Sequence, residues 1–174
     1  GRQNQSLLSW EAELTRALSL GLDHLSLYQL TIEGGTAFGD RYKAGRLSGL
    51  PDEDLSADMY NTTQDICDAF RMPRYEVSNH SSTGNESRHN LIYWRYGDYA
   101  GIGPGAHGRL TVGGSRFATE QTRMPASWLK KQEKEQREAL TQTDQGTEFL
   151  LMGLRLVEGI NLTRLNQLSC QQLN

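Results

Sequence analysis

The first eighty residues alternate between helical and strand-like apolar patterns, and this alternation restricts the fold more than any other feature of the sequence. Apolar residues recur at helical spacing over residues 6–20 and again over residues 52–70, where Asp52 is suited to cap the N terminus. Short strand-like segments, 24–30 and 74–79, follow these two helices. The sequence therefore predicts an α/β fold in which helix, strand, helix and strand form βα units of a parallel sheet.

A β-hairpin is predicted further along the chain. Residues 109–112 and 116–119 flank Gly113 and Gly114, and a glycine pair between two strand-like segments is typical of a tight hairpin turn. Residues 87–96 precede this hairpin and are expected to form a short helix or a turn.

Polar helices are expected after the hairpin. Residues 125–138 begin with proline, carry many charges and are predicted as one charged helix, followed by helices over 147–157 and 162–168. The change from alternating elements to polar helices places the expected domain boundary near residue 125. We therefore expect one domain over residues 1–124 and the start of another over residues 125–174.

Composition and charge exclude several classes of protein. The 18 basic and 21 acidic side chains give a net charge of −3, which argues against a nucleic-acid partner bound through its phosphates. Apolar runs are too short for a transmembrane segment. The two cysteines, Cys67 and Cys170, lie far apart, which excludes a disulfide framework and a cysteine-only metal site within this chain. Cys67 is expected to be a small buried residue, and a reducing, cytoplasmic location is the default expectation.

A glycine-rich segment, residues 101–108, is one candidate for a binding loop. Its four glycines allow the backbone to approach a ligand closely. The spacing, interrupted by Pro104, is not a dinucleotide fingerprint, and the segment lacks the lysine of a phosphate-binding P-loop. Two interpretations stay open: a tight turn before the hairpin, or a loop at the carboxyl end of a barrel strand that wraps a cofactor, with His107 directed at it.

Histidine and aromatic residues gather just before this loop. His89, with Tyr93 and Trp94 nearby, could ligate a metal or a haem iron beside an aromatic surface. The alternative is a hydrogen-bonded structural histidine. The spacing between His80 and His89 is not the i, i+4 spacing of a helical zinc pair, so no zinc site is predicted.

Polar residues end both predicted strands of the alternating region. Gln29 and Thr31 lie at the end of the strand over 24–30, whose two largely apolar faces are typical of a strand covered on both sides. Buried polar groups without a partner cost about 1–3 kcal/mol, so a ligand or a neighbouring backbone is expected to pair with them. Asn79 and His80 come at the end of the second strand, where they either contribute to a site or cap the turn.

Five longer strings of the sequence resemble a known family. In chain order the strings are HLSLYQLTIEGGTAF, LPDEDLSADMY, PRYEVSNHS, SRHNLIYWRYGDYAGIGPGAHGRL and LLMGLRLVEGINL. They are similar to the oxygen-independent coproporphyrinogen III oxidase-like radical S-adenosylmethionine (SAM) proteins, and more narrowly to the haem chaperone branch of that family. The pattern His89-Asn90-x-x-Tyr93-Trp94 favours the chaperone branch over the oxidase.

The resemblance implies the C-terminal half of a partial (β/α) TIM-like barrel of the radical SAM type, followed by the start of a helical C-terminal domain. Family members are much longer and hold a [4Fe-4S] cluster through a Cys-x3-Cys-x2-Cys motif that this chain lacks. We therefore expect a fragment without the N-terminal cluster-binding half, inactive in SAM cleavage on its own. Such a fragment is expected to expose apolar surface on its first helix and strand, or to form an oligomer that covers it.

The resemblance also implies site residues, cofactors and partners. Thr31 and His107 match positions that contact SAM in the family, and His89 matches the proposed haem ligand. The implied cofactors are SAM, haem and a [4Fe-4S] cluster whose ligands lie outside this chain, so neither a catalytic residue nor a cluster ligand is assigned within it. The implied partners are haem and haem-accepting proteins, some of them associated with membranes.

Three functions follow from these observations as alternatives. The favoured one is haem binding and transfer to haem-dependent proteins by a radical SAM-type protein. The second is an enzyme, an oxygen-independent coproporphyrinogen III oxidase that decarboxylates propionates. The third, a small binding module without a cofactor, would have to fold stably alone, and the open strand edges of a halved barrel argue against it.

Overall fold

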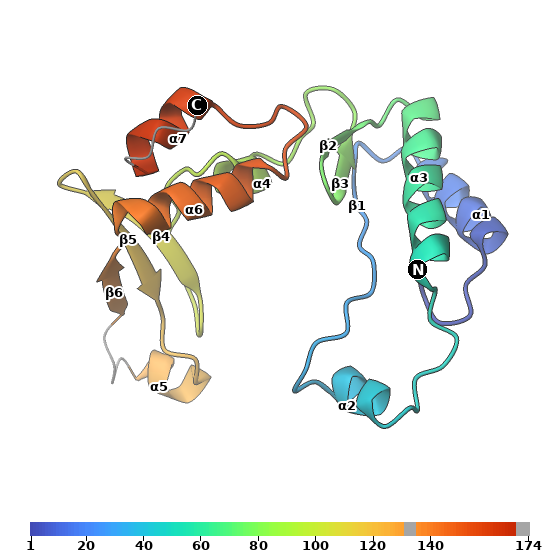
Figure 1. Ribbon diagram of the computed structural model, residues 1–174, viewed down its shortest axis with the longest axis horizontal. Coiled ribbons are helices and arrows are strands. Elements are labelled where there is room, and N and C mark those ends of the chain that lie inside the picture. Colours follow the sequence, from blue (N-terminus) through green and yellow to red (C-terminus); the bar gives the residue numbers. More distant parts are fainter. Residues whose placement is uncertain (131–134, 170–174) are drawn as a thin grey trace. The chain divides into compact units, whose positions relative to one another are not determined.

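The computed structural model describes residues 1–130 and 135–169, in two compact units, Gly1–Glu86 and Ser87–Asn174 (Figure 1). Each unit has its own hydrophobic core and its own three-stranded sheet. The elements of the first unit are α1 (Leu7–Leu18), β1 (His24–Ser26), α2 (Ala37–Lys43), α3 (Glu53–Ala69), β2 (Arg74–Glu76) and β3 (Asn79–Ser81). Those of the second unit are α4 (Arg88–Trp94), β4 (His107–Val112), β5 (Ser115–Glu120), α5 (Pro125–Leu129), β6 (Gln136–Ala139), α6 (Gln142–Gly153) and α7 (Leu162–Ser169).

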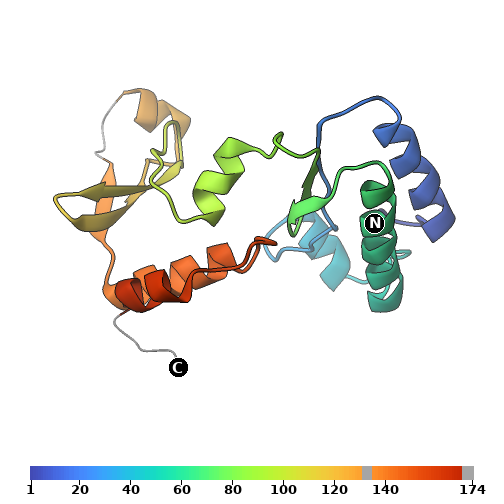
Figure 2. The ribbon, with the colours of Figure 1, turned by 90° about the horizontal axis from the view of Figure 1, so that it is seen from above.

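Two helices form the core of the first unit. The helices α1 and α3 pack side by side (Figure 2), and Leu14 and Leu18 of α1 are buried in one cluster with Cys67 and Met72. Asp52 caps α3 by accepting a hydrogen bond at 2.8 Å from the backbone N–H three residues later. Both predicted helices and the burial of Cys67 are therefore confirmed.

The sheet of the first unit differs from the predicted parallel arrangement. Its strand order is β1-β3-β2 and both pairs are antiparallel, because a turn at Val77 and Ser78 divides the predicted strand 74–79 in two. The buried carboxylate of Glu76 accepts hydrogen bonds from the backbone of Ser78 at 2.8 Å and from the side-chain amide of Asn79. These bonds hold the turn. The strands β1 and β2 still run in the same direction, since each is antiparallel to β3.

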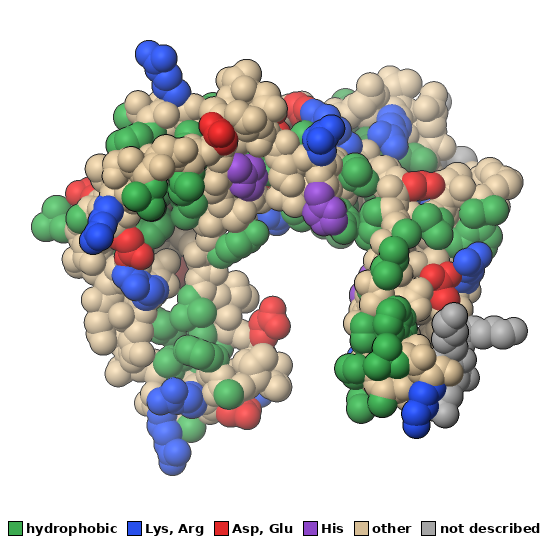
Figure 3. Space-filling view, turned by 180° about the vertical axis from the view of Figure 1, so that it is seen from behind, with side chains coloured by type: hydrophobic (Ala, Val, Ile, Leu, Met, Phe, Trp, Pro, Cys, Tyr) green, Lys and Arg blue, Asp and Glu red, His purple; other side chains and the backbone are tan. Residues whose placement is uncertain are grey.

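The prediction of a strand covered on both sides over residues 24–30 is wrong. The strand β1 ends at Ser26, and the side chains of Tyr28 and Leu30 are 72% and 46% exposed. Only one side of this segment packs against the core of the unit. Exposed apolar side chains appear on the face shown in Figure 3, and Leu8 of α1 is 76% exposed. Apolar surface on the first helix and on the segment after β1 is thus confirmed.

The second unit contains the predicted hairpin. The strands β4 and β5 pair antiparallel, and the turn residues Gly113 and Gly114 have φ angles of +59° and +81°. This left-handed region favours glycine and matches the twist of a hairpin. The short helix predicted over residues 87–96 is confirmed as α4, which Ser87 caps.

The single charged helix predicted over residues 125–138 is wrong. The helix α5 ends at Leu129, residues 131–134 lie outside the described residues, and β6 pairs antiparallel with β5. Ala139 is the one apolar residue in this segment, so a helix there would have no apolar face to bury. Pairing with the edge of β5 instead satisfies the backbone groups of this segment.

The two later helices are confirmed as α6 and α7. The helix α6 begins earlier than predicted because Thr141 and Asp144 form a capping box. It meets α7 at Gly146, where an added Cβ would collide with Ser169. This close approach places Phe149 in the core of the second unit.

The predicted domain boundary near residue 125 stays a prediction. The two compact units divide between Glu86 and Ser87. Pairing between β5 and β6 joins residues on both sides of the predicted boundary into one sheet.

Candidate functional site

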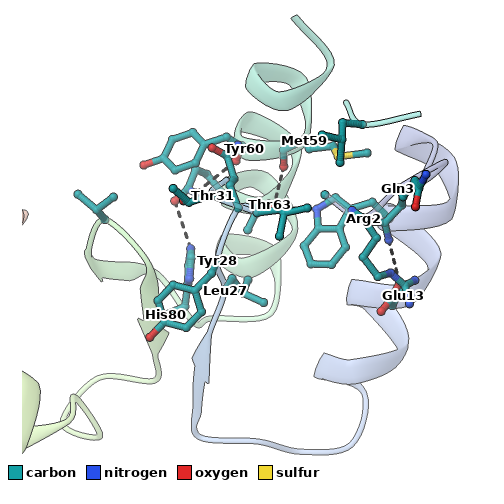
Figure 4. A pocket seen from close by; sticks show the side chains of 18 of the residues that line it. Arg2, Gln3, Glu13, Leu27, Tyr28, Thr31, Met59, Tyr60, Thr63 and His80 are labelled. Atoms are coloured by element: carbon teal, nitrogen blue, oxygen red, sulfur yellow. Dashed lines mark hydrogen bonds and ion pairs between the residues drawn. The ribbon is translucent and has the colours of Figure 1, made fainter. Parts of the chain in front are cut away.

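A pocket of about 680 Å³ opens in the first unit between α1, α3 and the segment that follows β1 (Figure 4). Its volume lies within the range of about 300–1,000 Å³ that is typical of small-molecule sites. Thr31, one of the residues expected to contact SAM, lines it. The apolar and aromatic part of its lining includes Trp10, Leu27, Phe38, Met59, Tyr60 and Val77.

Polar contacts fix several walls of this pocket. The indole N–H of Trp10 donates to the hydroxyl of Thr63 at 2.8 Å, and that hydroxyl donates to a backbone carbonyl of α3 at 2.6 Å. Arg2 and Glu13 form an ion pair at another wall. Because Thr31 is exposed, its hydroxyl is open to a ligand in the pocket.

His80 contributes a buried polar group to the same pocket. The sequence predicts it at the end of the strand over 74–79, whereas the structure places it in the middle of β3 with 1% of its surface exposed. Its Nε2 lies 3.3 Å from Oε1 of Gln64, and its Nδ1 has no hydrogen-bond partner among the described residues. Desolvation by burial lowers the pKa of His80, so its imidazole is neutral near pH 7.

The free energy of unfolding is expected to depend on pH through His80. Desolvation is the main cause of its lowered pKa; Asp68 and Glu76 oppose the shift, while Arg74 and His24 add to it. The unfolded chain, with a histidine pKa of about 6.5, therefore binds this proton before the folded chain does as the pH falls. The contribution of His80 to stability is fully present above about pH 6.5 and is lost as the pH falls toward the folded-state pKa.

Denaturant unfolding of the whole chain from about pH 5 to about pH 8 measures this dependence. In the His80→Gln variant the free energy of unfolding of the first unit should vary less with pH than in the wild type. His24→Gln, which removes a histidine from the same sheet, is the control. An undiminished pH dependence in His80→Gln would assign the effect to another group.

His89 lies in the first turn of α4 with its side chain exposed, so its imidazole is accessible to a large ligand. The ring of Tyr93, one helical turn later, meets it edge-on, with the two ring centroids 4.7 Å apart and an interplanar angle of 75°. The structure thus provides the aromatic neighbour that the sequence pattern indicates. The role of His89 as a haem ligand stays a prediction.

His107 is the first residue of β4 and is exposed. The glycines around it allow close backbone packing: a Cβ on Gly101 would lie 2.5 Å from the carbonyl oxygen of His107, and one on Gly108 would lie 2.5 Å from Oγ1 of Thr119. These close approaches explain both glycines without a ligand, as the tight-turn interpretation predicts. Contact between His107 and SAM stays a prediction.

A charged network in the second unit was missed by sequence reasoning. Glu148 of α6 accepts hydrogen bonds from Nη2 of Arg109 at 2.7 Å and from its Nε at 3.1 Å, and another from the hydroxyl of Tyr96 at 2.9 Å. Desolvation of Glu148 raises its pKa, but the hydrogen bonds from Arg109 and Tyr96 outweigh it and hold the pKa below its usual value. Arg109 and Glu148 are 39 residues apart, so no local spacing could reveal the pair.

The part of the chain that the structure describes does not fit an iron–sulfur cluster. Within residues 1–130 and 135–169, no group of three His, Cys, Asp or Glu side chains could hold a metal ion. Cys67 is fully buried, and desolvation raises the pKa of its thiol to about 11, so it is not a thiolate ligand. Cys170 lies outside the described residues. Within the described ranges, no helix is long and apolar enough to span a bilayer.

The residues present do fit SAM and haem. The pocket around Thr31 combines the aromatic side chains of Trp10 and Tyr60 with polar side chains such as that of Gln64, a mixture that suits a nucleoside with an amino-acid tail. His89 offers an exposed imidazole beside an aromatic ring, which suits a haem iron.

Known proteins resemble this chain over most of its length. Heme chaperone HemW from Escherichia coli (strain K12) is 38% identical over 159 residues, which cover 91% of this chain and 41% of that protein. The mitochondrial radical S-adenosyl methionine domain-containing protein 1 from Danio rerio is 38% identical over 165 residues, which cover 90% of this chain and 37% of that protein. Residues 140–174 match the family model described as the HemN C-terminal domain.

The fold has a counterpart among solved structures. Coproporphyrinogen III oxidase (HemN) from Escherichia coli, described as a radical SAM enzyme, matches with a TM-score of 0.71 and 15% identity over 98% of this chain and 42% of that chain. This likeness confirms the predicted α/β fold of the radical SAM type. The chain spans about two fifths of the length of these relatives. It belongs to the radical SAM family of oxygen-independent coproporphyrinogen III oxidase-like proteins and haem chaperones.

Proposed function

We propose that this chain is part of a haem chaperone of the radical SAM family, which binds haem and passes it to haem-dependent proteins. The relatives that are named heme chaperones support this proposal. The structural observation that carries it is the exposed imidazole of His89 beside the ring of Tyr93. The proposed location is the cytoplasm, and the proposed partners include haem-accepting proteins associated with membranes.

In this proposal one imidazole nitrogen of His89 would bind the haem iron. The edge-on contact with Tyr93 limits rotation of the imidazole, so its lone pair keeps a defined direction. Ile92 lies three residues after His89 on the same side of α4 and is 43% exposed. It offers an apolar contact to the haem macrocycle next to the iron ligand.

Thr31 in the pocket of the first unit and His107 at the start of β4 are proposed to contact SAM, as the family resemblance implies. SAM on a [4Fe-4S] cluster supplies radical chemistry when both are bound. The hydroxyl of Thr31 would orient SAM by a hydrogen bond, and the apolar walls of the pocket would exclude water from it. The described residues include no cluster ligands, so no chemical step is assigned to them.

Replacing His89 with alanine in the whole chain is expected to weaken haem binding by at least about tenfold, because the haem iron would lose the imidazole proposed to bind it. Titration with ferric haem, followed through the Soret band, measures the Kd and the band position. His24→Gln is the control, since it removes a half-buried histidine of the first unit. An unchanged Kd and Soret band in His89→Ala would exclude His89 as the ligand.

The alternative function, an oxygen-independent coproporphyrinogen III oxidase, predicts a different result. A protein of that kind decarboxylates coproporphyrinogen III when its cluster and SAM are present, and it has no need of His89 as an iron ligand. Decarboxylation by the complete protein, together with unchanged haem binding in His89→Ala, would favour the oxidase over the chaperone.

A further inference from the structure

A third aromatic ring, that of Tyr99, lies next to the pair formed by His89 and Tyr93. The centroid of the Tyr99 ring lies 4.2 Å from that of Tyr93, with an interplanar angle of 57°. His89, Tyr93 and Tyr99 therefore form a continuous row of three rings, which we call the aromatic row. The first two residues belong to α4, whereas Tyr99 lies outside that helix.

Tyr99 is fixed by the sheet. Its backbone N–H donates to the carbonyl of Arg109 in β4 at 2.8 Å, and its carbonyl accepts from the N–H of Arg109 at 2.9 Å. The side chain of Arg109 is in turn bound to Glu148 of α6. Tyr99 is partly buried, and burial raises the pKa of its phenol, so the ring remains neutral at physiological pH. Tyr99, at one end of the aromatic row, is therefore held in place by its backbone hydrogen bonds to β4.

His89, by contrast, has little to hold it apart from Tyr93. It is exposed, and α4 is only seven residues long. Exposed side chains change rotamer within picoseconds to nanoseconds, and ordering a side chain on binding costs free energy. The contact with Tyr93 reduces this cost only if the ring of Tyr93 is itself held in place.

We propose that Tyr99 is a positioning residue for haem: through Tyr93 it fixes the direction in which His89 presents its imidazole. This inference rests on the proposed function, because it takes His89 as the iron ligand. Tyr99 acts through the stacking of its ring and not through its hydroxyl. Phenylalanine at this position should therefore preserve its effect, and an aliphatic side chain should not.

Ferric haem titrations of three variants of the whole chain test the proposal. Tyr99→Ala and Tyr99→Leu should each weaken haem binding by about threefold to tenfold, the range expected for the loss of one aromatic pair. They should also shift or broaden the Soret band and the EPR signal of the ferric haem. Tyr99→Phe should keep the wild-type values. Tyr99→Leu retains most of the buried volume, so it tests the ring separately from packing and serves if Tyr99→Ala does not fold.

Arg164→Ala is the matched control for lost stability in the second unit. Arg164 lies over the ring of Phe149, with its guanidinium carbon 5.1 Å from the centroid, and donates to the backbone carbonyls of Arg95 and Tyr96. Its loss should lower the stability of the unit without changing the haem spectrum, since the hydrogen bonds and the ring contact described for it involve no member of the aromatic row.

The outcomes separate this inference from the proposed function. The positioning role of Tyr99 would be overturned if Tyr99→Leu and Tyr99→Ala both kept the wild-type Kd and spectra while His89→Ala lost haem binding. His89 would then remain the proposed ligand. The positioning role would also be overturned if Tyr99→Leu and Arg164→Ala had the same free energy of unfolding and changed the haem spectrum equally. Wild-type haem binding in His89→Ala would instead remove the proposed function, and the inference with it.

Discussion

Replacing Leu14 with alanine is expected to lower the free energy of unfolding of the first unit by about 2–5 kcal/mol, the largest change in stability expected for this chain. Leu14 is 1% exposed and packs in α1 against Leu18, Cys67 and Met72. Alanine removes the buried methyl groups and leaves a cavity that the surrounding helices fill only in part. The packing of α1 on α3 should therefore weaken throughout their contact.

Hydrogen exchange of the whole chain, resolved by mass spectrometry, reports on the two units separately. Protection should fall in α1, α3 and β3 and remain unchanged in the second unit. Leu8→Ala is the matched control, because Leu8 lies on the same helix with 76% of its surface exposed and should change stability by less than about 0.5 kcal/mol. Equal losses in Leu14→Ala and Leu8→Ala would contradict the packing described for α1.

The elements that the sequence predicted correctly are those whose causes are local. The helix over residues 52–70 has an aspartate cap and apolar residues at helical spacing, and both act within a few residues. The hairpin depends on Gly113 and Gly114, whose positive φ angles only glycine adopts readily. Such elements can be inferred from one stretch of sequence, because the interactions that form them lie inside that stretch.

The errors come from interactions that the pattern of residue types does not show. The predicted strand 74–79 has strand-like residues throughout, but the chain turns back at Val77, where buried Glu76 accepts hydrogen bonds from residues two and three positions further on. Residues 136–139 carry a polar, charged pattern that is compatible with a helix. They form β6 because β5 offers an unpaired edge, which no local pattern reveals.

Only part of the candidate site could be predicted, for the same reason. The family resemblance indicated Thr31, His89 and His107 as site residues, and the structure places Thr31 in a pocket and His89 beside Tyr93. The burial of His80 could not be inferred, because it depends on the pairing of β3 with both of its neighbours. The sequence pattern marked polar residues at the ends of strands as functional candidates without showing which ones are buried.

Replacing Glu148 with alanine is expected to lower the free energy of unfolding of the second unit by about 2–3 kcal/mol. Its carboxylate is the shared acceptor for Arg109 and for the hydroxyl of Tyr96, and the Glu148 and Arg109 side chains are each 21% exposed. Without it, a guanidinium and a hydroxyl lose a charged partner in a site that water reaches only in part. Hydrogen exchange should show lower protection in β4 and α6, and the free energy follows from denaturant unfolding.

Glu158→Ala is the matched control, because Glu158 also binds an arginine through both of its carboxylate oxygens but in an exposed pair. Arg95 and Glu158 are 53% and 50% exposed, so this replacement should cost less than about 1 kcal/mol. A similar loss in both variants would mean that burial does not strengthen the Glu148 network.

Since Arg109 also holds Tyr99 by its backbone, Glu148→Ala should disturb the aromatic row as well. The haem spectrum of Glu148→Ala should therefore change in the same direction as that of Tyr99→Leu. A wild-type haem spectrum in Glu148→Ala, at the expected loss of stability, would show that the backbone bridge between Tyr99 and Arg109 holds without the ion pair.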